Sequence, residues 1–382
     1  MPKNRRCRRK ILISRTDAPG PVVSGPRHVL LRYLSFALMT RTLLATCILT
    51  GLMEVLSLLE QMTPILQRHL GIYGVVTFMV LHIPLALQTA LPLGLQIGAL
   101  TLLTALTVGN ETAILRSAGL STFGLFMRLL PATFLIGMLS LAIEDQVTPR
   151  TEMILAGWWS RTDPAPEKSR SFWIHGPDWL AHIGYISEAG RQIHDVDLYR
   201  RDKTGLMTEA NHASSGVEGP GVWIMHDVST IRIPPDGLPD IAPIRAEEIL
   251  PAHISAYEML RLSMEKAPLS MHYMWQALHG RQITDQSDDY LRSAIFERLL
   301  RIPVFIVMLL LALPVIYIPP RAGLRSWLPV WCLGGGLLFI ITQGIFRAMG
   351  NAGLLPAPIA TIPVLLIFIL VAGTVLIRNE DL

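Results

Sequence analysis

The chain has 382 residues, of which 51% are hydrophobic and only 16% are charged. Soluble proteins of this length carry roughly a quarter charged residues, so the composition excludes an ordinary soluble domain over the whole length. Although the formal net charge is +4, 23 of the 29 acidic residues lie between Glu144 and Glu297. Basic residues beside apolar segments usually fix membrane orientation, so we expect no nucleic-acid partner.

Residues 1–26 are polar, and basic residues cluster between Arg5 and Lys10. A secretory signal would need an apolar core directly after this cluster, and residues 11–13 are too short for one. We therefore predict a basic, disordered cytoplasmic tail over residues 1–26. A start codon assigned too far upstream explains the same residues equally well.

Six apolar stretches follow, each long enough for the roughly 20 residues that a membrane-spanning helix needs. The second stretch holds no Asp, Glu, Lys or Arg and is long enough for one extended helix or for two short spans broken near Pro84 and Pro92. The six stretches are residues 33–59, 70–109, 117–143, 302–320, 326–346 and 354–377.

Flanking charges favour six spans over seven. Nine Lys or Arg residues precede Tyr33, and Arg321 and Arg325 lie between the fourth and fifth stretches. Six spans place all of these basic residues on the cytoplasmic side, whereas seven would put Arg321 and Arg325 outside. The prediction is a polytopic membrane protein with both termini cytoplasmic. Three spans fall in residues 27–146, an outside domain in 147–290 and three more spans in 291–382.

The outside domain begins with alternating, β-branched and aromatic segments separated by glycine and proline turns. This pattern predicts strands at residues 172–175, 179–186, 193–199 and 222–233. Short antiparallel strands at this spacing are typical of a sandwich or a roll. Residues 247–262 and 271–279 resemble short amphipathic helices that return the chain to the membrane.

Several chemical motifs are absent from the sequence. None of the five lysines follows a glycine, so the chain has no GxxxxGK[ST] phosphate loop and cannot hydrolyse ATP by that route. The histidines of the β region fit no zinc spacing, and ordinary surface histidines explain them better. We therefore predict no catalytic residue, no metal ligand and no cofactor bound by this chain.

The connection between the second and third stretches is the most informative segment. Near residues 109–119 a short helix is expected, with Asn110 as its cap, Glu111 at its positive end and Gly119 at its exit. Composition leaves two interpretations open, an amphipathic connector or a docking helix for a soluble motor.

Five short motifs, in this order along the chain, resemble those of the LptF/LptG (YjgP/YjgQ-type) permeases of the lipopolysaccharide-export ABC transporter. The resemblance spans about residues 32–376, and the motifs are Arg32-Tyr33, Glu60-Gln61, Glu111 with Arg116 and Ala118-Gly119-Leu120-Ser121, Glu144-Asp145-Gln146-Val147-Thr148-Pro149-Arg150, and Arg321-Ala322-Gly323-Leu324-Arg325. Residues 343–350 look closer to the LptG branch than to the LptF branch.

The resemblance implies a multi-pass protein of the bacterial inner membrane with a periplasmic β-jellyroll. It implies that Glu111, Arg116 and Gly119 couple the chain to a cytoplasmic ATPase dimer similar to LptB, which uses the ATP. The other implied partners are a second permease of the same family, periplasmic bridge proteins similar to LptC and LptA, and lipopolysaccharide itself.

We expect the β domain to form an open roll with an apolar interior that serves as a lipid path. Strand alternation predicts five inward-facing side chains, namely Trp173, Ile183, Tyr185, Leu198 and Trp223. Glu54 and Arg68 are further candidates for the lipid path. Family members often place basic residues along the outer part of the first span, and this chain does not. Either Arg68 replaces them, or the exported glycolipid carries fewer phosphates. An acid inside a span usually faces a cavity, and the alternative for Glu54 is a helix–helix hydrogen bond.

Two other functions remain open at this point. A membrane-bound lipid-modifying enzyme would need convergent catalytic groups, and His272, Tyr273 and His279 are the only suggestive set. A scaffold or sensor would use the β domain to bind a partner without transport. Co-purification with an ATPase would separate both from a transporter.

Overall fold

The computed structural model describes residues 26–117, 119–164, 170–175, 179–202, 206–220, 222–233, 240–250, 254–264, 267–284, 286–317 and 326–380. All but the last residue of the predicted tail lies outside these residues. The basic connection at residues 321–325 lies outside them as well.

In the part of the chain that the structure describes, five helical units are long and apolar enough to cross a membrane, and a bent helix pair makes a sixth if it is counted as one span, which agrees with the predicted six. Four of them are single helices, one is a helical arm that passes through a π-helical turn, and one is a helix pair bent by 51°. In chain order these are α1 (Pro26–Gln67), α2 (Gly71–Val108), the arm α4–η1–α5 (Thr122–Ala142, Ile143–Val147, Thr148–Arg161), the bent pair α8 (Asp288–Leu299) and α9 (Arg301–Ala312) with the 3-10 turn η4 (Leu313–Tyr317), α10 (Leu328–Asn351) and α11 (Ala357–Glu380).

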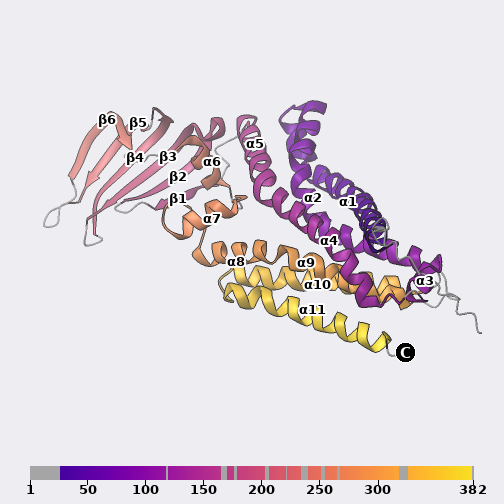
Figure 1. Cartoon of the computed structure of the whole chain (residues 1–382). Coiled ribbons are helices and arrows are strands. Elements are labelled where there is room, and N and C mark those ends of the chain that lie inside the picture. The colour runs from indigo at the N-terminus through magenta and orange to yellow at the C-terminus, as the bar shows by residue number, and fades with distance from the viewer. Residues whose placement is uncertain are drawn as a thin grey trace, which may run out of the picture.

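The second apolar stretch is one helix, because α2 continues through Pro84 and Pro92. This result removes the seven-span alternative. The short helix α3 (Glu111–Ser117) follows α2, and Figure 1 places α3 and the C-terminus at one end of the bundle, opposite the sheet.

The predicted boundary at residues 146 and 147 falls inside the arm, on the turn η1. The arm continues as α5 as far as Arg161, and the first strand begins only at Phe172. The apolar stretch ends earlier than the helix because α5 leaves the bundle and carries polar and charged residues on the way to the sheet (Figure 1).

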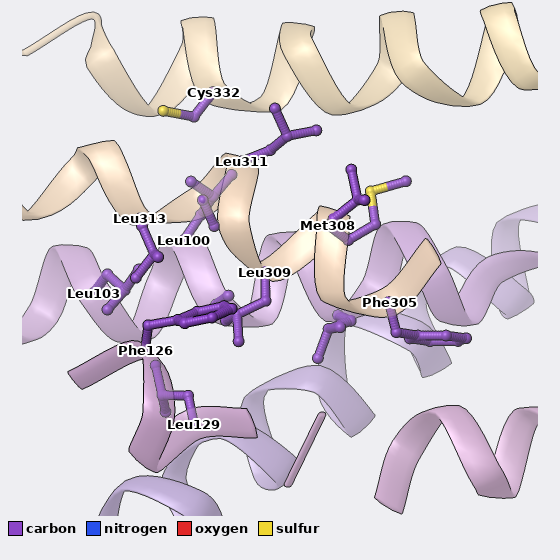
Figure 2. Close-up of a cluster of buried hydrophobic side chains, with 14 of the residues drawn as sticks. Leu100, Leu103, Phe126, Leu129, Phe305, Met308, Leu309, Leu311, Leu313 and Cys332 are labelled. Carbon is purple, nitrogen blue, oxygen red and sulfur yellow. The ribbon is translucent and has the colours of Figure 1, made fainter. Parts of the chain in front are cut away.

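The bundle core lies where α2, α4 and α9 meet (Figure 2). Leu103 of α2, Leu129 of α4 and Phe305 of α9 are completely buried there. Burial of apolar side chains between helices does not by itself hold helices together in lipid, so close packing must contribute. At Gly98 of α2 an added Cβ would lie 2.6 Å from the backbone nitrogen of Thr42, so α1 and α2 approach at backbone distance.

The inserted domain is a single antiparallel sheet of six strands, each paired with the next in sequence. It curves into an open roll (Figure 1) and does not form a two-sheet sandwich. The strands are β1 (Phe172–His175), β2 (Trp179–Ser187), β3 (Gln192–Arg201), β4 (Met207–Glu218), β5 (Trp223–Arg232) and β6 (Asp240–Leu250).

Two strands were missed by the sequence pattern. β4 is rich in Ala, Ser, Asn and His, and β6 contains Pro243, so neither shows the usual β-branched signal. The predicted helix at residues 247–262 was wrong in its first part, because residues 247–250 complete β6. The helix itself is α6 (Ala256–Ser263), and α7 (Met271–Leu278) follows it as predicted.

The foot of the roll is closed by helices. Met153 of α5 and Met259 and Leu260 of α6 pack with the buried side chains of β1 to β5 in one apolar cluster. The indole Nε1 of Trp223 donates a hydrogen bond to the carbonyl of Ile254 at 2.7 Å, which fixes β5 to the segment before α6. The roll therefore stands directly on the outer end of the helical arm.

Candidate functional site

The inner face of the roll is apolar, and three of the five predicted side chains lie on it. Ile183, Leu198 and Trp223 are 1%, 5% and 0% exposed, and they belong to the apolar cluster at the foot of the roll. Their predicted inward orientation is confirmed. Their contact with a lipid stays a prediction.

Trp173 and Tyr185 were wrongly predicted to face inward. Trp173 is 45% exposed and lies against the rings of His182 and Tyr199, with centroid distances of 4.7 and 6.2 Å. Tyr185 stacks on His194 at 4.5 Å between ring centroids. Both aromatic side chains therefore lie on the outer face of the sheet.

An irregular step across the sheet explains the error for Tyr185. Asp195 on β3 and Asp227 on β5 have φ angles of 55° and 56°, which is left-handed backbone inside a strand. Two consecutive residues then face outward, so alternation shifts by one position on either side of the step. Counting from Ile183, strict alternation selects Tyr185, whereas the next buried residue is Ile186.

A hollow of about 570 Å³ lies where the helices meet the foot of the roll. Arg68, which follows α1, and Trp159 of α5 line one side of it. Ile186 of β2 and Leu260 of α6 line the other side, and both also belong to the apolar cluster of the roll. The hollow therefore joins the outer ends of the membrane helices to the inner face of the sheet.

Arg68 is held firmly in the wall of this hollow. Its guanidinium lies 4.2 Å from the ring centroid of Trp159, donates to the Trp159 carbonyl at 2.5 Å and forms an ion pair with Asp163 at 3.4 Å. Burial lowers the pKa of Arg68, and the neighbouring Asp163 carboxylate acts in the opposite direction. An arginine remains charged in such surroundings, so Arg68 presents a positive charge at the entrance to the roll.

Glu54 is buried against α2 and does not line the Arg68 hollow. Its Oε1 lies 3.0 Å from Nδ1 of His82, whose ring stacks on Phe78 at 5.2 Å. The structure shows the alternative, a hydrogen bond between α1 and α2.

A charged joint that the sequence interpretation missed connects the arm to the bent pair. Arg298 of α8 pairs with Asp145 of η1 at 3.0 Å, and Asp145 also accepts the Met271 backbone N–H at 2.5 Å. Arg301 pairs with Glu144 at 3.2 Å. The signal was the acidic pair at the end of one apolar stretch and two arginines before another, because charges this close to the bilayer need partners.

At the opposite end of the bundle, α3 forms over the predicted segment. Glu111 is exposed, and Gly119 has a φ of +82°, the left-handed conformation that ends a helix. Asn110 also has a positive φ, of 57°, and its backbone N–H donates to the Thr107 carbonyl, so it reverses the chain after α2 and lacks the extended backbone usual for a cap. The backbone of Arg116 lies in α3, and its side chain is outside the described part of the structure.

The residues suggested for an enzyme do not converge. His279 Nδ1 lies 2.8 Å from the Trp275 carbonyl, His272 pairs with Gln276, and the Tyr273 hydroxyl donates to the Ile283 carbonyl. Each contact is local to α7 and the turn after it. Among the described residues, no group of three or more His, Cys, Asp or Glu side chains is arranged to hold a metal ion.

The family model for the lipopolysaccharide export system permease LptF/LptG matches residues 32–378. The chain belongs to this family. It is also similar to the lipopolysaccharide export system permease protein LptG of Haemophilus influenzae, with 21% identity over 361 residues that cover 92% of this chain and 98% of that protein. The resemblance seen in the sequence is thereby confirmed.

Family membership identifies the chain as a membrane permease of lipopolysaccharide export, and the apolar helices agree with a multi-pass protein of the inner membrane. Family membership therefore favours a transport subunit over the lipid-modifying enzyme considered from the sequence. The match begins inside α1 and ends inside α11, so it includes the Arg68 hollow, the charged joint and α3.

Proposed function

We propose that this permease extracts lipopolysaccharide from the outer leaflet of the inner membrane and passes its acyl chains to the inner face of the roll. Moving one methylene from lipid to water costs about 0.8 kcal/mol. A lipid with several chains must therefore pass from one apolar environment directly to another. The open roll standing on the membrane helices supplies such an environment.

The observation that supports this path best is the shared wall of the Arg68 hollow. Ile186 and Leu260 line the hollow and also belong to the apolar interior of the roll, so the two regions share an apolar wall at these residues. Arg68 provides a positive charge at the same place, which suits an anionic lipid headgroup. Ile183, Leu198 and Trp223 lie in the buried apolar cluster beyond it, which would have to open to admit an acyl chain.

Energy would come from a separate ATPase dimer in the cytoplasm, docked on α3. This helix exposes Glu111 together with Ile114, which is 66% exposed, so it offers a charge and an apolar anchor to a partner. A second permease of the family would complete the transport cavity. Periplasmic bridge proteins similar to LptC and LptA would extend the roll by pairing with its edge strands β1 or β6.

The proposed orientation has both termini and α3 in the cytoplasm and the sheet in the periplasm. It is supported by the placement of α3 and the C-terminus together at the end away from the sheet (Figure 1). In a variant without Cys7, Cys47 and Cys332, a cysteine at Ser214 should react with an impermeant maleimide from the periplasm, and one at Ser117 should not. The reverse pattern would refute the orientation.

Photo-crosslinking tests the lipid path. A photoreactive amino acid at Ile183, Leu198 or Trp223 should give an adduct with lipopolysaccharide in the assembled transporter, and the adduct should increase when ATP is added. Tyr185 and Trp173 are controls, because they are aromatic residues on the outer face of β2, the strand of Ile183, and of its neighbour β1.

Equal adducts on both faces, or adducts that form equally well without ATP, would remove the roll interior as a transport path. The absence of adducts at all three inner positions would leave the domain as a docking platform for other proteins.

A further inference from the structure

A second hollow, of about 880 Å³, lies on the opposite side of α5 from the Arg68 hollow. Ala156 and Ser160 face the first hollow, whereas Ile154 and Gly157 face the second. Successive residues of a helix are about 100° apart, so Ile154 and Ala156 point roughly in opposite directions. The two hollows therefore open on different faces of α5, and Leu260 of α6 lies in the wall of both.

The second hollow is rich in positive charge. Arg150 and Arg161 of α5 and Arg191, just before β3, line it, and Glu218 is the one carboxylate in its lining. Oε1 of Glu218 already accepts the backbone N–H of Ala256 at 2.7 Å. Within the described part of the chain, no ion pair occupies any of the three arginines, and all three are exposed.

The same hollow has an apolar floor and an aromatic rim. Met153 of α5 and Leu260 of α6 are buried beneath it, and Tyr73 and Trp158 stand at its edge. Aromatic side chains of this kind gather at the headgroup level of a membrane. This combination fits an amphiphilic ligand better than a free anion.

An apolar surface continues from the hollow along α2. Val76 and Val80 are 51% and 59% exposed, and each follows a lining residue, Tyr73 or Thr77, by three positions. Residues three apart are neighbours on a helix surface. A ligand with its head on the arginines would therefore find an exposed aliphatic surface for its tails.

We propose that this second hollow binds the phosphate headgroup of an anionic phospholipid from the outer leaflet, with its acyl chains lying on α2. Arg150 and Arg161 lie about 16 Å apart along α5, so with Arg191 they form an extended positive surface, and a phosphodiester can accept charge-assisted hydrogen bonds from the guanidinium groups nearest to it. The bound phospholipid is a resident component at the base of the roll. It is distinct from the transported lipid, because the site faces away from the Arg68 hollow.

The test compares the full-length permease with two triple variants in nanodiscs. The site variant is R150Q/R161Q/R191Q. The control variant is R201Q/R232Q/R281Q, which removes the same number of exposed arginines from positions outside the hollow. Phosphatidylglycerol is titrated into phosphatidylcholine nanodiscs, and the thermal unfolding midpoint and the phospholipid retained after purification are measured.

The wild type and the control variant should show a midpoint that rises with phosphatidylglycerol, and a retained phosphatidylglycerol molecule in native mass spectra. The site variant should bind phosphatidylglycerol at least about tenfold more weakly, because each surface arginine contributes on the order of 1 kcal/mol toward anionic lipid. If the triple variant fails to fold, R150Q, R161Q and R191Q alone should each weaken binding severalfold.

Two results would overturn the proposal. Equal phosphatidylglycerol dependence in the site and control variants would show that these arginines hold no headgroup. An equal rise of the midpoint with inorganic phosphate in phosphatidylcholine nanodiscs would show a soluble-anion site instead of a lipid site. Crosslinking of lipopolysaccharide inside the roll is measured separately, so its failure would not affect this test.

Discussion

The helices α1 and α2 are both long and strongly apolar, yet they occupy different positions in the bundle. In the most apolar stretch of α2, 67% of residues are buried inside the chain, against 22% for α1. The difference follows from their neighbours, because α1 packs mainly against α2 and α4, whereas α2 also packs against α5, α9 and α10. Small residues allow the closest contact between the two helices. Gly94 and Gly98 of α2 pack directly against Thr46 and Thr42 of α1, whereas a Cβ added at Gly51 of α1 would have nothing within 4 Å.

This comparison shows that apolar composition identifies a membrane helix and does not reveal what covers it. In lipid, an apolar side chain gains little by leaving the bilayer for another helix, so close packing and satisfied polar groups decide the arrangement. The centre of this bundle has close packing at the glycines of α2 and paired polar groups in the charged joint beside α9. The rim helices α1, α10 and α11 keep apolar surface available for lipid or for a second permease.

The largest effect is expected when the charged joint at the centre is broken. Arg298→Ala removes a nearly buried guanidinium and leaves Asp145 and the Leu269 carbonyl without it. Loss of one partner of a buried ion pair costs about 3–5 kcal/mol, so the thermal unfolding midpoint should fall sharply.

Arg292→Ala is the matched control, because Arg292 is exposed on the same helix. A surface substitution of this kind changes stability by about 0.5 kcal/mol or less. Similar midpoints for the two variants would show that the joint does not hold the arm and the bent pair together.

An intermediate effect is expected at the close contact between α1 and α2. Gly98→Ala places a Cβ 2.6 Å from the Thr42 backbone nitrogen, so the helices must separate. Overpacking costs about 1–3 kcal/mol. Gly51→Ala meets nothing and should stabilise the helix by roughly 0.5–1 kcal/mol. Paired unfolding measurements that gave the same sign for both variants would contradict the arrangement of α1 against α2.

The sequence was sufficient to locate the apolar helices and the inserted β domain, because long apolar stretches and strand patterns are local signals. It was not sufficient for the inner face of the roll. Tyr185 was misplaced because the left-handed backbone at Asp195 shifts the alternation, and an aspartate in a strand gives no advance sign of that conformation. Residues 207–218 were missed because pairing with β3 and β5 makes them a strand despite weak propensity.

For the candidate functional residues, too, positions set by nearby residues were predictable and contacts between distant residues were not. Glu111 and Gly119 were placed correctly because a helix end depends on nearby residues. The partners of Glu54 and Asp145 are His82 and Arg298, which are 28 and 153 positions away along the chain, and no local pattern reveals such contacts. The arginines of the second hollow were equally hidden, because Arg150 and Arg191 meet only after the arm and the sheet have packed together.

The smallest effect on stability and the clearest effect on function are expected at α3. Glu111→Lys reverses an exposed charge at a helix start, where the loss of a favourable dipole interaction costs about 0.3–1 kcal/mol. The unfolding midpoint should therefore change little. If α3 docks on a basic groove of the ATPase, the new lysine repels it, and ATP hydrolysis should no longer respond to lipopolysaccharide in the reconstituted complex. Ser117→Lys is the control, because it adds a charge at the exposed far end of the same helix and leaves Glu111 in place. Normal stimulation in the Glu111→Lys complex, or equal loss in both variants, would remove Glu111 as a specific contact to the motor.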